Sequence, residues 1–184
     1  LGTISARGGA NGGDGGFVET SGKTYLDVNG IRVNTGGGNW LLDPTDITVV
    51  HSLSYGGGTF TGGVFENGGG ATATLNDFDI NANLASNDIT ITTSSAGGGI
   101  GDIKFDGSVG TIIISNSSGN RNLTLTADND IIFTGGATIF TTTGPSSPLD
   151  IGFNPGVGRK VEIQAGAFAV FDGLDGSSSV RAAI

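Results

Sequence analysis

The sequence predicts an all-β fold in which short parallel strands stack as a β-solenoid. Short runs that alternate apolar residues with Thr, Asn or Asp recur along the chain, and turns rich in Gly, Asn and Ser separate them. Glycine supplies 36 of the 184 residues. No window combines apolar residues at helical spacing with good helix-forming residues. Together these observations favour strands and turns throughout.

The expected strands follow one another closely. In chain order they are Thr3–Ala6, Phe17–Thr20, Thr24–Val28, Ile31–Val33, Trp40–Leu42, Asp46–Val50, Ala73–Leu75, Asp79–Ala82, Asp88–Thr92, Asp102–Phe105, Thr111–Ile114, Leu123–Thr126, Asp130–Phe133, Ala137–Phe140, Leu149–Ile151, Val161–Gln164 and Phe168–Phe171.

A weak internal repeat links several of these strands. The pattern Asp-Ile-x-apolar begins at Asp46, Asp79, Asp88, Asp102, Asp130 and Asp150. We expect each Asp to form a corner by bonding its own local backbone, and the two apolar residues to point to one side of a strand. An antiparallel sandwich is the alternative, but its strands are usually longer, about 5–6 residues, and its hairpins more regular. A recurring corner-and-strand unit favours stacked coils.

The chain is expected to form one domain. Residues 1–55 are predicted to be the first coils, 56–71 a Gly-rich loop or excursion, and 72–184 the continuing coils. The loop could bind a ligand, but a simple bulge is the favoured interpretation. Because the chain begins at Leu1 and lacks a signal peptide, we expect it to be a fragment of a longer protein.

Composition excludes several classes of function. The net charge is −9 and only eight residues are Lys or Arg, so neither a nucleic-acid groove nor binding to an anionic membrane surface is expected. No apolar run approaches the ~18 residues of a membrane span. The absence of Cys excludes disulfides and thiolate zinc sites.

Three stretches near the N-terminus carry a family resemblance, namely Gly2–Gly9, Gly13–Gly22 and Gly38–Thr48, the last with the sequence GNWLLDPTDIT. They resemble the large exoproteins of bacterial two-partner secretion, of the filamentous-haemagglutinin and high-molecular-weight adhesin type. The later stretches Asn87–Thr93 and Leu123–Ile132 are similar to the β-helical repeat region of that family.

The resemblance implies a right-handed parallel β-helix, exported unfolded through an outer-membrane β-barrel partner and folded at the cell surface. The family's secretion domain carries Asn-Pro-Asn-Gly motifs, whereas this chain has only Asn154-Pro-Gly156. This chain therefore resembles a region beyond the secretion domain.

No catalytic constellation is apparent. His51 is the sole His, and no Gly-x-Ser-x-Gly elbow accompanies it. The carboxylate pairs Asp77/Asp79 and Asp128/Asp130 could serve a polysaccharide-cleaving site. Corner positions explain them more simply. We therefore expect no enzyme activity and no cofactor.

Binding sites are also weakly indicated. Asp14 and the Asp128–Asp130 segment could offer oxygens to calcium, but the tandem calcium repeat is missing, so no metal is expected. The Thr-x-Thr pairs Thr90/Thr92, Thr124/Thr126 and Thr141/Thr143 could order water on a flat face, or could simply be solvated.

Three residues remain as candidate sites. Asn116 and Asn122 begin the Asn-x-Ser/Thr sequons and could be glycosylated. Trp40 is the sole Trp; we expect it to pack under the first coils, and the alternative is stacking against a glycan.

The sequence thus predicts a non-enzymatic, extracellular or cell-surface, adhesin-like β-helix that acts as a structural shaft. One alternative is a fibre subunit that stacks end to end as a homopolymer. The other is a carbohydrate-binding or polysaccharide-active β-helix. The expected partners are the outer-membrane transporter and a glycan or protein on a host or neighbouring cell.

Overall fold

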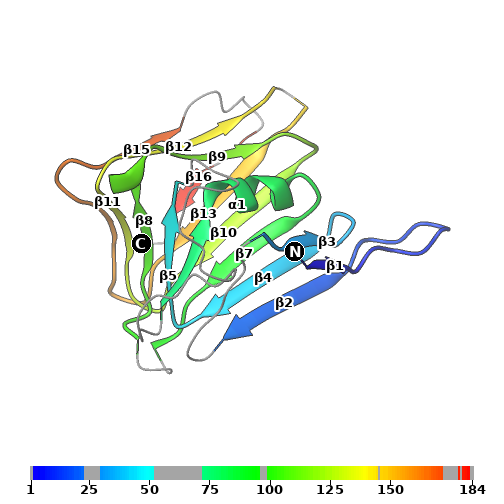
Figure 1. Cartoon of the computed structure of the whole chain (residues 1–184), viewed down its shortest axis with the longest axis horizontal. Coiled ribbons are helices and arrows are strands. Elements are labelled where there is room, and N and C mark those ends of the chain that lie inside the picture. Colours follow the sequence, from blue (N-terminus) through cyan, green and yellow to red (C-terminus); the bar gives the residue numbers. More distant parts are fainter. Residues whose placement is uncertain are drawn as a thin grey trace.

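The computed structural model describes residues 2–22, 30–51, 72–95, 99–144, 146–171, 178 and 180–182. These residues form parallel β-sheets with little helix (Figure 1), so the predicted all-β class is confirmed. Every pairing between named strands is parallel, and one isolated antiparallel bridge joins Gly9 to Gly12. The expected strand Thr24–Val28 and the Gly-rich segment 56–71 lie outside the described residues.

The strands belong to four sheets. The six-stranded sheet contains β2 (Phe17–Gly22), β4 (Asn39–Pro44), β7 (Asp88–Thr92), β10 (Arg121–Thr126), β13 (Leu149–Asn154) and β16 (Val180–Ala182). The five-stranded sheet contains β6 (Thr72–Asn76), β5 (Asp46–Val50), β8 (Ile103–Asp106), β11 (Ile131–Thr134) and β14 (Val161–Ile163). The three-stranded sheet contains β9 (Ile112–Asn116), β12 (Ala137–Thr142) and β15 (Phe168–Phe171), and the two-stranded sheet contains β1 (Thr3–Ser5) and β3 (Arg32–Asn34).

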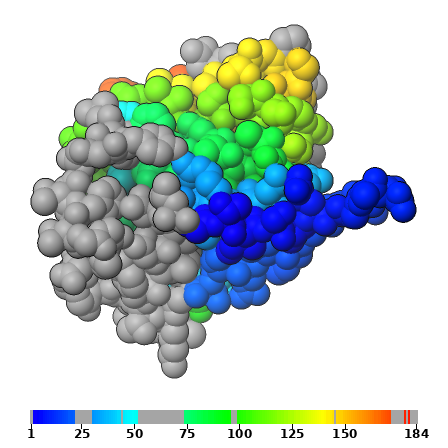
Figure 2. Space-filling model, turned by 45° about the vertical axis from the view of Figure 1, so that its right-hand side comes forward, coloured from blue at the N-terminus to red at the C-terminus, as the bar shows by residue number. Residues whose placement is uncertain are grey.

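From β7 onward the chain visits the larger sheets in a fixed order. It passes from the six-stranded sheet to the five-stranded and then the three-stranded sheet, first through β7, β8 and β9, next through β10, β11 and β12, and then through β13, β14 and β15. We call each such passage a layer. Ile89, Leu123 and Ile151 lie in register, 34 and 28 residues apart (123 − 89 and 151 − 123). Figure 2 shows the described part of the chain stacked in sequence order, from blue near the N-terminus through green to yellow.

Alternation along each strand builds the core. The inward residues of the six-stranded sheet include Trp40, Ile89, Leu123 and Ile151, which are at most 1% exposed. Outward neighbours such as Thr90 and Thr124 are paired on the other side of the same sheet. Successive side chains of a strand point to opposite faces of the sheet. This register therefore stacks each inward apolar residue on an inward apolar residue of the neighbouring strand.

Aromatic residues fill the space between the sheets in the later layers. Phe105 and Phe133 stack with ring centroids 4.9 Å apart, and Phe133 meets Phe140 and Phe153 edge-on at 6.3 and 6.0 Å. Offset-stacked and edge-to-face geometries are the favourable ones for aromatic pairs. The rings therefore link all three larger sheets.

The corner aspartates act differently from the expectation. Asp46 accepts the backbone N–H of Asp102 at 2.9 Å, Asp102 accepts that of Asp130 at 3.1 Å, and Asp130 accepts that of Lys160 at 3.0 Å. Each carboxylate thus binds the backbone of the next layer rather than its own turn. These three members of the Asp-Ile repeat therefore tie successive passages of the chain together at one corner.

Glycine is required where turns of successive layers meet. A Cβ on Gly16 would overlap the carbonyl oxygen of Ala6, and a Cβ on Gly38 would overlap that of Gly16. These glycines immediately precede β2 and β4. Part of the unusual glycine content thus permits close backbone approach.

One predicted strand is wrong. Asp79–Ala82 lies inside helix α1 (Asp77–Leu84), which follows β6 directly. A short 3-10 helix, η2 (Gly107–Val109), separates β8 from β9. Strand β16 (Val180–Ala182) was not expected from the sequence.

The two ends of the stack differ. In the last layer the inward residues Val161, Ile163 and Phe171 are 37%, 54% and 42% exposed, whereas their register partners one layer earlier are at most 1% exposed. Near the other end, Val18 on β2 and Leu75 on β6 are only 9% and 2% exposed. Among these strands, only those of the C-terminal layer leave their inward apolar side chains exposed.

Candidate functional site

Helix α1 carries the densest group of buried polar side chains in the described part of the chain. The Asn76 side chain caps its N-terminus by accepting from the Asp79 N–H at 2.8 Å, and its amide donates to the Asp79 carboxylate at 2.8 Å. This reciprocal arrangement stabilises a helix start. Asp77 and Asp79 in the first turn also suit the positive end of the helix dipole.

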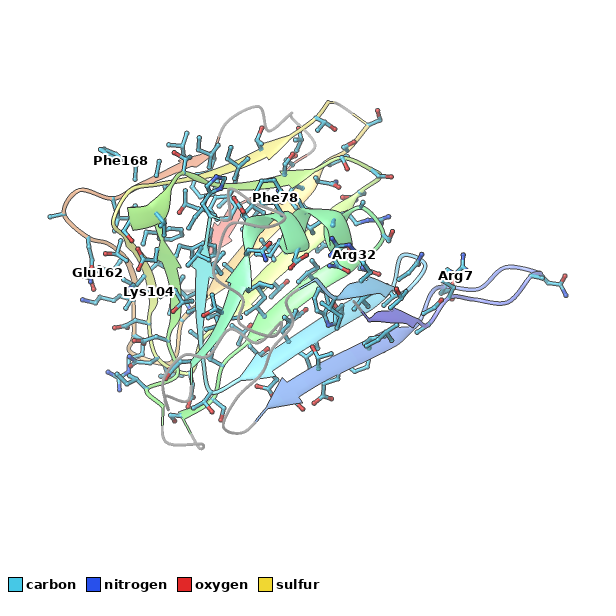
Figure 3. All side chains as sticks on the ribbon, viewed as in Figure 1. Arg7, Arg32, Phe78, Lys104, Glu162 and Phe168 are labelled. Carbon is cyan, nitrogen blue, oxygen red and sulfur yellow. The ribbon has the colours of Figure 1, made fainter. Side chains whose placement is uncertain are left out.

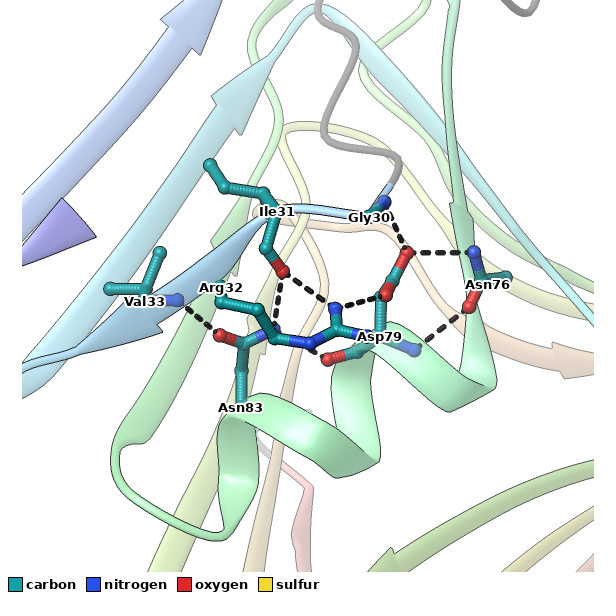
Figure 4. A network of polar contacts seen from close by, with 7 residues as sticks. All are labelled: Gly30, Ile31, Arg32, Val33, Asn76, Asp79 and Asn83. Carbon is teal, nitrogen blue, oxygen red and sulfur yellow. Dashed lines mark hydrogen bonds and ion pairs between the residues drawn. The ribbon is translucent and has the colours of Figure 1, made fainter. Parts of the chain in front are cut away.

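One side of α1 binds the edge of β3 (Figure 4). The Asn83 side chain accepts the Val33 N–H at 2.6 Å and donates to the Ile31 carbonyl at 3.3 Å. Asp79 accepts the Gly30 N–H at 2.9 Å and pairs with the Arg32 guanidinium at 2.6 Å. The helix thus satisfies alternate backbone groups of β3 and of the two residues before it, as a neighbouring strand would.

Asn87 extends this contact beyond the helix. Its side chain accepts the Thr35 N–H at 2.6 Å and donates to the Val33 carbonyl at 2.8 Å. Asp79, Asn83 and Asn87 are spaced four residues apart, so they lie along one side of the helical path. Asn83 and Asn87 are both fully buried.

The opposite side of α1 binds the edge of β9. Asp77 accepts the Ile113 N–H at 3.0 Å, while Asn81 donates to the Ile113 carbonyl and accepts the Ser115 N–H, both at 2.8 Å. His51 adds a polar contact, with its Nδ1 2.8 Å from the Asp77 carboxylate. The helix therefore occupies the position of one strand between β3 and β9.

The C-terminus of α1 is held by β10. The Arg121 Nε donates to the Leu84 carbonyl at 2.9 Å, and a second guanidinium nitrogen lies 3.5 Å from the Ala85 carbonyl. A cation is favourable at this negative end of the helix. Both ends and both sides of α1 are thus tied to neighbouring layers.

The polar side chains of this site bind one another and the backbone of the neighbouring strands. Within the described residues, no buried side-chain nitrogen or oxygen lacks a hydrogen-bond partner, and no three His, Cys, Asp or Glu side chains are grouped to hold a metal ion. His51 and Asp77 meet each other, and Asp77 also binds the backbone of β9. Helix α1 thus links the edge of β3 to the edge of β9. The sequence alone did not predict this role.

Trp40 lies in the core. Its indole is 0% exposed, and Nε1 donates to the Thr20 hydroxyl at 3.1 Å. A ring without an exposed face cannot stack on a sugar, so the glycan-stacking hypothesis fails for this residue. The alternative expectation, packing under the first strands, is confirmed.

The two sequon residues differ sharply. Asn116 is 0% exposed, and its amide donates to the carbonyls of Gly119 and Pro148 at 2.7 and 2.8 Å. In the folded chain this amide is inaccessible to a glycan donor. Asn122 is exposed on β10, where its amide donates to Asp88 at 3.0 Å, so glycosylation there stays a prediction.

The remaining candidates do not converge. Asp14 is exposed. Asp128 accepts from the Ser95 N–H and hydroxyl, which lowers the pKa of its carboxyl, whereas Asp130 binds the Lys160 N–H. Thr90 pairs with Thr124, and Thr92 with Thr126, in a small outward array on the six-stranded sheet.

Sequence reasoning missed a carboxylate pair on the outer face of the six-stranded sheet. Burial raises the pKa of Asp43 above its ordinary value of 3.8, and the neighbouring Glu19 carboxylate raises it further. Glu19 pairs with Leu41 and Asp43 with Ser21, so the two carboxylates lie at diagonal outward positions on β2 and β4. Only the strand register could have revealed this pair.

We predict that Glu19→Gln lowers the pKa of Asp43 toward its ordinary value. A raised folded-state pKa means that the folded chain binds the proton more tightly than the unfolded chain, so stability falls as pH rises through this pKa. Glu19→Gln removes the repulsion between the two carboxylates, so stability should fall less as the pH rises through the pKa of Asp43. Carboxyl NMR titration of Asp43 measures the shift, with Asp106→Asn as a distant control. An unchanged Asp43 pKa would contradict the assigned cause.

Comparison of the chain with protein-family models, curated proteins and solved structures finds no match. Among the described residues, no helix has the length and apolar character required to cross a membrane.

Proposed function

We propose that the chain is a right-handed parallel β-helix that serves as a non-enzymatic shaft segment of a large extracellular, adhesin-like protein. The supporting observation is the repeated passage through three parallel sheets in one order. Parallel strands joined by crossovers are almost always connected with right-handed geometry, which favours that hand.

A stiff rod follows from this arrangement. Each layer forms backbone hydrogen bonds with the next, while inward apolar rows run across the layers. Helix α1 keeps the stack continuous where a strand is missing. Because the buried polar groups serve this stacking, a mechanical role fits the site better than catalysis.

Export and location rest on the sequence resemblance. We propose secretion through an outer-membrane β-barrel partner and display on a bacterial cell surface, where the shaft holds a binding region away from the cell. The absence of clustered cations in the sequence agrees with a partner other than nucleic acid.

End-to-end assembly is the second candidate, because the C-terminal layer leaves β14, β15 and β16 at the sheet edges. Exposed Ile163 and Phe171 could be covered by another copy. The burial of Val18 and Leu75 at the other end gives less support to head-to-tail stacking. The carbohydrate-binding alternative loses its aromatic candidate, because Trp40 is buried.

Single-molecule pulling between the chain ends tests the shaft. We expect force peaks spaced by about 100–120 Å, since layers of 28 and 34 residues extend by up to about 3.6 Å per residue. Extension without force peaks would contradict a mechanical role. A glycan panel and electron microscopy of concentrated protein are the parallel measurements: glycan binding would favour the carbohydrate-binding alternative, and filaments would favour end-to-end assembly.

A further inference from the structure

An apolar stripe crosses the outer face of the three-stranded sheet and α1. Ile113, Ile139 and Val170 lie in register on β9, β12 and β15. Ile113 and Val170 are each 40% exposed, and Phe168 beside them is 63% exposed. Phe78 on α1, 44% exposed, extends the stripe toward the N-terminal layers (Figure 3). We call these five residues the apolar stripe.

Charged side chains are absent from the outward positions beside the stripe on β9 and β12, and at its α1 end the His51 ring lies 5.7 Å from Phe78 and contacts the buried Asp77 carboxylate. The outward neighbours of the stripe on β9 and β12 include Ser115, Ala137 and Thr141. By contrast, the six-stranded sheet presents Glu19, Asp43, Asp88 and Asp150 at outward positions, and the five-stranded sheet presents Lys104, Asp106 and Glu162 (Figure 3).

We infer that the apolar stripe is the contact through which two copies of the chain pair side by side. Each copy has a net charge of −9, so the copies repel wherever their charged faces approach. The neutral face lets them meet without bringing carboxylates together. A membrane would require cations around the stripe, and an acidic or basic peptide would require opposite charge; neither surrounds these residues.

The geometry suits a twofold contact. A flat sheet face packs on another about 10 Å away, with strands crossing at a small angle. Because the same stripe is used on both copies, the contact closes at a dimer, in contrast to end-to-end stacking, which is open-ended. This inference goes beyond the shaft function and does not depend on it.

Sedimentation velocity over a concentration series, about 1 μM to 1 mM, tests the proposal. The unaltered chain should show a monomer–dimer equilibrium that tightens with added salt, because salt screens the repulsion between copies. Ile139→Glu at the centre of the stripe should weaken dimerisation by at least about tenfold. The matched control is Ile132→Glu, an outward Ile on the five-stranded sheet between Lys104 and Glu162, which should leave it unchanged.

Cysteine variants give a second test, which does not place a charged residue in a sheet. The chain has no Cys, so Thr141→Cys introduces a single thiol beside the stripe, and Thr124→Cys places one on the six-stranded sheet. Mild oxidation should link Thr141→Cys into dimers much faster than Thr124→Cys.

A monomer at every concentration would overturn the proposal, as would equal effects of the two Glu variants or equal cross-linking of the two Cys variants. Larger open-ended species would also overturn it and favour end-to-end stacking. None of these outcomes changes the force peaks expected of the shaft, so the two proposals fail separately.

Discussion

Replacing Asn83 by alanine is expected to lower the free energy of unfolding by about 2–4 kcal/mol. The Asn83 side chain is fully buried and is the acceptor for the Val33 N–H, at 2.6 Å. Its amide also donates to the Asp79 carbonyl at 2.7 Å. Truncation leaves the Val33 N–H buried without its partner, and the cost of an unsatisfied buried group exceeds the net value of an ordinary hydrogen bond.

The matched control for this change is Asn81→Ala on the same helix. Asn81 makes the equivalent pair of bonds to β9, but it is only half-buried, so water can replace the lost partner. We expect a loss of about 1 kcal/mol. Urea unfolding followed by Trp40 emission measures both variants. Equal, small losses would show that α1 does not act as a substitute strand.

The strands were predictable because their signal is local. Alternating residues such as Ile89-Thr90-Ile91 indicate a half-buried strand wherever they occur. The segment Asp79–Ala82 has the same short pattern, yet it is helical because Asn76 caps it and its polar side chains meet two sheet edges. The Asn76-x-x-Asp79 spacing is the signal that could have indicated a helix start.

The candidate site was less predictable because its contacts are distant in the sequence. Val33 and Asn83 are 50 residues apart, and Asp77 lies 36 residues before Ile113. Only the stacking of layers brings them together. The corner role of Asp102 illustrates the same limit: turn chemistry predicts a local bond, whereas the carboxylate accepts from Asp130 in the next layer.

Replacing Phe133 by alanine is expected to cost about 3–5 kcal/mol of unfolding free energy. The ring is 1% exposed, stacks on Phe105 at 4.9 Å and meets two further rings edge-on. Removing it leaves a cavity between the three larger sheets and deletes aromatic pairs worth about 0.5–1.5 kcal/mol each beyond their buried area. Tight packing around the site limits how far the neighbours can collapse into the space.

Phe168→Ala is the matched control, because it removes the same side chain from an outward position that is 63% exposed. At concentrations where the chain is monomeric, its unfolding free energy should change by no more than about 0.5 kcal/mol. Urea unfolding of both variants at one low concentration makes the comparison direct. If Phe133→Ala cost as little as Phe168→Ala, the apolar interior would not be the closely packed column that supports the layers, and the proposed shaft function would lose its physical basis.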